Sequence, residues 1–95
     1  MTIYTILFDW ATGDSHDVEL FVYTNELLAK EKFKSLIQDE KSENSWCGEF
    51  FTPTGKFNKK YADEVDYTET SELFHLQPFN SPNYSTIKLT KHFVK

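Results

Sequence analysis

The chain contains no arginine. All ten basic residues are lysine, and fifteen aspartates and glutamates oppose them, so the formal net charge is -5. Arginine is the usual residue for gripping phosphate and carboxylate groups through two parallel hydrogen bonds. Its absence and the negative charge argue against functions that depend on nucleic acid, nucleotides or other anionic substrates. We therefore expect no nucleic-acid partner.

Cysteine is also scarce. Cys47 is the single cysteine, so an intrachain disulfide is excluded, and a lone thiol fits a reducing compartment better than secretion. The N-terminus shows no signal-peptide pattern, and the longest near-apolar run, residues 3–8, is far shorter than the ~20 residues that span a bilayer. We expect one cytoplasmic domain, residues 1–95, without membrane contact.

Signatures of catalysis are missing as well. The sequence has no phosphate-binding loop, no dinucleotide-binding glycine pattern, no zinc-protease motif and no paired cysteines. The neighbours of Cys47 include no cation that would lower the thiol pKa. Three aspartates and His16 cluster around the first turn, but their spacing is not that of a calcium loop, which favours a solvated acidic turn. We expect no enzyme activity, no catalytic residues, no cofactor and no metal.

Aromatic residues, by contrast, are abundant: nine Phe, five Tyr and two Trp. Apolar and aromatic residues at both odd and even positions predict a central strand, covered on both faces, over residues 2–10. Alternation along residues 17–23 predicts a second strand, and turn-forming residues 11–15 join the two. Thr24 is a suitable N-cap, so a helix is expected from Asn25 to about Lys41. Its apolar stripe consists of Ala29, Phe33, Leu36 and Ile37.

A second hairpin is expected near the C-terminus, from strands at residues 72–79 and 84–94 around the loop 80–83. This loop predicts that Leu76 faces Ile87, Phe74 faces Leu89 and Glu72 faces Lys91. Residues 42–71 lack a clear period, apart from a short helix suggested by the spacing of Phe57, Tyr61 and Val65. The predicted fold is α+β: an antiparallel four-stranded sheet in the order ββα, long connection, ββ, with one principal helix packed on one face.

The first hairpin has two apolar faces, whereas one helix can cover only one of them. We expect the helix to lie on the face that carries Ile3, Leu7, Val18, Leu20 and Val22. The opposite face then carries one isoleucine and five aromatic rings: Tyr4, Ile6, Phe8, Trp10, Phe21 and Tyr23. Either residues 42–71 cover this aromatic face, or a partner does, because such a patch is large for a monomer. The five aromatic residues are therefore predicted partner-binding residues.

An acidic run at the end of the connection contains no lysine: Asp63, Glu64, Asp66, Glu69 and Glu72. It is either a solvated, self-repelling loop or an anionic strip that docks on a basic groove of another protein. The first four of these residues are predicted to bind the partner.

In size and composition the chain resembles the small, acidic, lysine-only α+β proteins of phages and mobile elements, which include anti-CRISPR and other anti-defence inhibitors. The resemblance implies a non-enzymatic protein that blocks a basic surface on a partner protein. The alternative is a homodimeric structural or accessory module.

Overall fold

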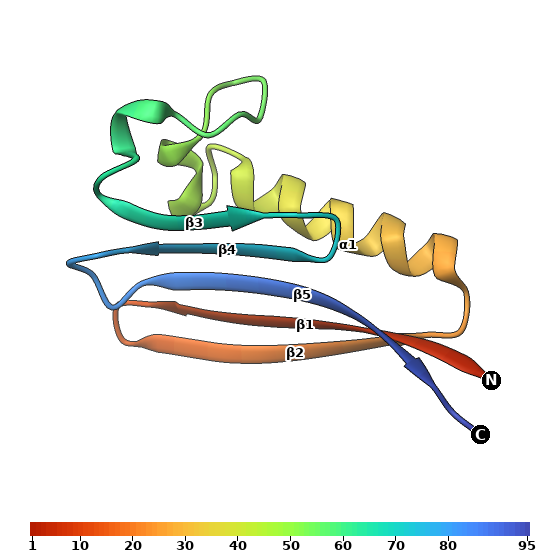
Figure 1. Cartoon of the computed structure of the whole chain (residues 1–95). Coiled ribbons are helices and arrows are strands. Elements are labelled where there is room, and N and C mark those ends of the chain that lie inside the picture. Colours follow the sequence, from red (N-terminus) through yellow and green to blue (C-terminus); the bar gives the residue numbers. More distant parts are fainter.

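Five antiparallel strands and one α-helix form the computed structural model, which describes all of residues 1–95 (Figure 1). The sheet has the strand order β2-β1-β5-β4-β3, and β1 is its second strand. The elements are β1 (Thr2–Thr12), β2 (Ser15–Tyr23), α1 (Glu26–Lys41), η1 (Trp46–Phe50), η2 (Lys59–Tyr61), β3 (Val65–Glu69), β4 (Leu73–Pro78) and β5 (Tyr84–Phe93). The α+β class and the antiparallel sheet are confirmed, but the expected four strands are five.

The first hairpin closes on a two-residue turn, Gly13 and Asp14, because Thr12 pairs with Ser15. Gly13 has a φ of 56°, a backbone conformation that glycine adopts without steric cost, and glycine at the first turn position suits the twist of a tight hairpin. The turn is therefore shorter than expected, and both strands extend further towards it.

Helix α1 begins one residue later than its predicted N-cap would place it. Asn25, rather than Thr24, is the N-cap, since its side-chain oxygen accepts a hydrogen bond of 3.1 Å from the backbone N–H of Leu28. The helix ends at Lys41, as expected. Its buried residues are those of the predicted stripe: Ala29, Phe33, Leu36 and Ile37.

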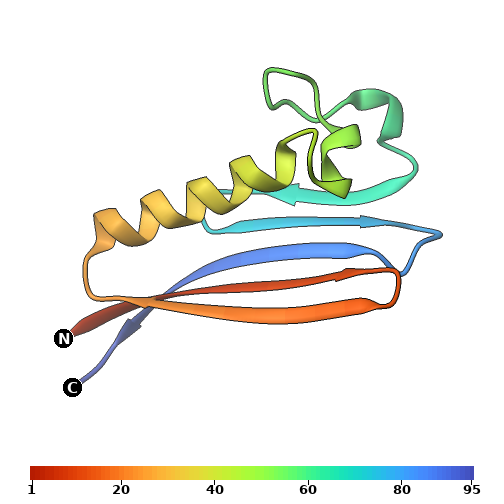
Figure 2. The ribbon, with the colours of Figure 1, turned by 180° about the vertical axis from the view of Figure 1, so that it is seen from behind.

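The helix covers the opposite face of the first hairpin from the one we expected. Tyr4 and Ile6 are buried beneath it, whereas Leu7 and Leu20 are exposed. In both views α1 and the connection to β3 lie on the same side of the sheet, and the other side is bare (Figure 2). Burying rings removes more apolar surface from water than burying valine and leucine, which is the physical reason for this choice of face.

The connection after α1 covers the rest of the aromatic side of the sheet, over β3 and β4. Phe51 lies 6.0 Å from Phe74 between ring centroids, and Phe57 stacks on Tyr67 at 4.6 Å. The predicted helix through Phe57, Tyr61 and Val65 is wrong: only a single 3-10 turn forms there, and Val65 begins β3. The chain thus covers its own aromatic face.

The second hairpin has a different register from the predicted one. Phe74 pairs with Ile87 and Leu76 pairs with Ser85, a shift of two residues from the expected partners. Because side chains alternate with a period of two, the shift keeps every residue on its predicted face. The loop is held by contacts that are remote in sequence: the Phe79 N–H donates to the Glu64 carbonyl, and the Asn83 side chain accepts from the Gly13 N–H.

Candidate functional site

The bare side of the sheet carries a contiguous apolar surface on the first hairpin. We call it the open-face patch: Leu7, Val18, Leu20 and Val22. Leu7 pairs with Leu20 across the two strands, and the two valines lie two residues to either side of Leu20 along β2. The four side chains are between 40% and 62% exposed. They form the broadest run of exposed apolar residues on neighbouring strands.

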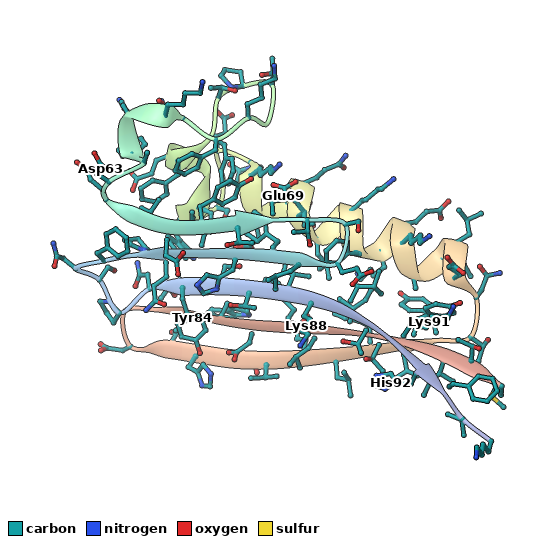
Figure 3. The ribbon with its side chains drawn as sticks, in the orientation of Figure 1. Asp63, Glu69, Tyr84, Lys88, Lys91 and His92 are labelled. Carbon is teal, nitrogen blue, oxygen red and sulfur yellow. The ribbon has the colours of Figure 1, made fainter.

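Polar residues border this patch on the β5 side. Lys88 pairs with Leu7, and Asp9 pairs with Val18. Tyr84, Lys88 and His92 share the open face of β5 (Figure 3). The Asp9 carboxylate accepts a 2.8 Å hydrogen bond from the Tyr84 hydroxyl, and this bond raises the pKa of Tyr84 above its ordinary value.

The end of the patch nearest the turn is acidic. Asp9 pairs with Val18 and shares its open face, whereas Asp17 and Glu19, the neighbours of Val18 along β2, point to the covered face because side chains alternate along a strand. His16 lies 3.2 Å from Asp9 (Nε2 to Oδ1). The structure contains no group of three or more His, Cys, Asp or Glu side chains arranged to hold a metal ion.

The aromatic residues predicted to bind a partner lie on the covered face. Tyr4 is buried, and its hydroxyl donates a 2.9 Å hydrogen bond to Glu26 at the start of α1. Phe21 lies beneath the Lys32 ammonium, 4.7 Å from the ring centroid. Phe8, Trp10 and Tyr23 are half-buried on the same face. The expectation that these rings form the uncovered surface is therefore corrected.

The acidic run is divided by the fold rather than displayed as one strip. Glu69 is 2.8 Å from the Lys41 ammonium, and Asp66 is 3.6 Å from His75 Nε2. Asp63 and Glu64 are exposed and form no ion pair (Figure 3). Only this corner before β3 presents free carboxylates from the predicted set.

Sequence reasoning missed Phe79, which is 62% exposed in the β4–β5 loop next to the acidic corner. Its backbone N–H donates a 3.0 Å hydrogen bond to the Glu64 carbonyl, which holds this loop against the acidic corner. An aromatic residue in a loop of Asn, Ser and Pro was the available signal. It was overlooked because the predicted loop began one residue later.

Cys47 cannot act as a nucleophile in this fold. Its side chain is completely buried, and Sγ donates a 3.2 Å hydrogen bond to Glu40 Oε2. Burial, reinforced by the Glu40 charge and this hydrogen bond, raises the pKa of the thiol well above its usual range. The thiolate needed for chemistry is therefore suppressed at neutral pH.

The raised pKa of Cys47 predicts a loss of stability at high pH. The thiol ionises near pH 9.0 in the unfolded chain but only at higher pH in the folded one, so the folded state binds the proton more tightly. The contribution is complete below pH 9 and is lost as the pH rises. Urea unfolding should show a free energy of unfolding that falls as the pH is raised above 9. Cys47→Ala should make the free energy of unfolding fall less steeply with pH. An unchanged slope would show that the Cys47 thiol is not the cause.

The hollows of the surface do not resemble small-molecule sites. One of them, of about 620 Å³, lies between the end of α1 and the turn at residues 52–55. Ten residues line it, and only one of them, Phe51, is a large apolar residue. Ligand sites are usually apolar with a few convergent polar groups, so this open, polar hollow supports no ligand.

Comparison of the chain with protein-family models, curated proteins and solved structures gave no match. No helix in the fold combines the length and the apolar composition that crossing a membrane requires.

Proposed function

We propose that this chain is a non-enzymatic protein-binding protein and that a partner docks on the open-face patch. The observation that supports this is the patch itself: four exposed apolar side chains that adjoin one another on the uncovered side of the sheet. Soluble monomers rarely leave contiguous apolar surface of this kind without a binding role. A flat sheet face suits a protein surface better than a small molecule, which prefers a concave pocket.

The charge around the patch indicates the chemistry of the partner. Asp9 lies opposite Val18 on the open face, and the whole chain carries a net charge of -5. A partner with an apolar centre and a rim of lysine or arginine complements this arrangement and associates faster because of long-range attraction. Asp63 and Glu64 at the far corner add a second anionic contact.

A small acidic protein can inhibit its target by occupying a basic surface that the target needs. We propose this mode of action, inhibition without catalysis, in the cytoplasm, in keeping with the resemblance to small anti-defence proteins of phages and mobile elements. A homodimeric module remains the second candidate, and the free edge of β2 favours it.

Partner binding is expected to depend on the open-face patch. The double variant Leu20→Ser and Val22→Ser should weaken binding about tenfold or more, because it removes two apolar side chains from the contact. The matched control is Leu27→Ser with Leu28→Ser on α1, which are 66% and 51% exposed but lie away from the patch. Affinity capture isolates the partner, and calorimetry with the captured protein then measures the affinity of the patch variant and of the control variant.

Two results would contradict the proposed function. Equal loss of affinity in the patch variant and the α1 variant would show that the patch has no special role. Affinity that does not change between low and high salt would exclude a basic partner, because attraction between exposed charges is screened within about 8 Å at physiological ionic strength.

A further inference from the structure

Strand β2 forms one edge of the sheet and leaves a row of backbone groups free. The two-residue turn closes on the hydrogen-bonded pair Thr12 and Ser15, so odd-numbered residues of β2 direct their N–H and C=O groups towards β1. The even-numbered residues 16–22 direct theirs outward. Consistent with this, the Val18 N–H donates a 2.8 Å hydrogen bond to Oδ1 of the neighbouring Asp17 rather than to another strand.

This edge lacks most of the features that normally prevent pairing with another strand. It runs for nine residues without proline, lysine or a bulge, and each residue of β2 is paired in sequence with β1. The side chains of residues 15–20 are all exposed, so no other part of the chain covers the edge. The other edge, β3, also carries two carboxylates, as β2 does, but it is only five residues long. Thus β2 is the edge that is open to a further strand.

We propose that β2 pairs antiparallel with β2 of a second copy about a two-fold axis, joining two five-stranded sheets into one. The axis must be normal to the sheet, so a residue pairs with one that lies on the same face. Both helices then lie on one side and both open-face patches on the other. This inference concerns the strand edge and is independent of the partner proposed for the open face.

The side chains select one register of this pairing, the one centred on Leu20. It places Leu20 opposite the partner's Leu20 and Val18 opposite the partner's Val22, so the open face gains only apolar pairs. On the other face, Glu19 lies opposite the partner's Phe21. Seven residues of each strand, 17–23, are paired, and no two carboxylates lie opposite each other.

The neighbouring registers are less favourable. Centring the pair on Glu19 places the two Glu19 carboxylates opposite each other, and centring it on Val18 places Asp17 opposite the partner's Glu19. Like charges directly opposite destabilise a pair of strands. Centring it on Phe21 avoids the repulsion but pairs only residues 19–23 within the strand.

The register centred on Leu20 also supplies a missing charge partner. Lys32 lies over the ring of Phe21 at 4.7 Å and makes no ion pair within its own chain, and neither does Glu19. Because the partner's Glu19 lies opposite Phe21 on this same face, its carboxylate comes next to Lys32. The two-fold axis creates this contact twice, which complements charge across the interface.

The experiment exchanges these charges. The variants Glu19→Lys and Lys32→Glu should each raise the dimer dissociation constant about tenfold or more, since each turns two attractive contacts into repulsive ones. An equimolar mixture of the two variants should form heterodimers, because every facing pair then has opposite charge. Size-exclusion chromatography with light scattering, over a range of protein concentrations, measures the molar mass of each variant, of their mixture and of the unaltered chain.

A cross-link tests the register without relying on charge. Leu20→Cys faces its own copy and should form an intermolecular disulfide on mild oxidation, because facing residues lie about 5.5 Å apart between Cα atoms. Val22→Cys, which faces Val18, should not. An unaltered chain that stays monomeric at every concentration, a mixture that fails to associate, or equal cross-linking at both positions would each overturn the proposed dimer.

Discussion

Phe74→Ala is expected to lower the free energy of unfolding by about 3–5 kcal/mol. Phe74 is completely buried on β4, and its ring contacts two others, 6.0 Å from Phe51 and 6.2 Å from Tyr67 between centroids. It therefore joins the sheet to the connection that follows α1. Removing the ring leaves a cavity beneath two aromatic neighbours that are fixed by the backbone, so the site cannot collapse fully.

The matched control is Phe79→Ala, the same substitution at a position that is 62% exposed. Exposed positions of this kind usually change stability by about 0.5 kcal/mol or less. Urea unfolding of both variants gives the comparison. A similar loss of stability in the two would mean that Phe74 does not lie in the core. If the β4–β5 loop contacts the partner, Phe79→Ala should weaken partner binding more than Phe74→Ala does.

Gly48→Ala is expected to destabilise the protein by about 3 kcal/mol, because there is no room for a methyl group. A Cβ at this position would lie 2.0 Å from the carbonyl oxygen of Ser42 and 2.7 Å from its carbonyl carbon. Both are backbone atoms, so they cannot move aside as a flexible side chain would. The same oxygen accepts a 3.1 Å hydrogen bond from the Ser45 N–H, which the displacement would break.

Gly13→Ala separates this steric effect from the cost of losing a glycine. No atom lies within 4 Å of a Cβ at Gly13, but its φ of 56° is unfavourable for alanine, which should cost about 1–2 kcal/mol. The loss at Gly48 should therefore be clearly larger by urea unfolding. Equal losses, or a native-like Gly48→Ala protein, would show that η1 can move away from the end of α1.

Local sequence patterns predicted the secondary structure well where the period was long and regular. The helix ends at Lys41 and buries the four predicted residues, and each strand residue of the second hairpin lies on its predicted face. The hairpin register failed by two residues because side-chain alternation cannot distinguish shifts of two. It is decided by contacts with remote residues, such as the bond between Gly13 and Asn83.

The fifth strand was missed for a different reason. Only Val65 and Tyr67 of β3 face the core, and the acidic residues between and beyond them are typical of a solvated loop. Charged residues are also a common feature of edge strands, which they protect from unwanted pairing. A five-residue strand with two acidic residues is therefore hard to distinguish from a loop until its neighbour β4 is known.

The sequence alone determined that the first hairpin has two apolar faces, that the helix has a single buried stripe, and that the chain is acidic and free of arginine. Those properties depend on side-chain spacing and charge, which are local. Only the tertiary structure decided which face the helix covers, and hence that the valines and leucines, rather than the rings, meet solvent. That choice depends on the total apolar area that α1 and the connection bury together against the whole sheet.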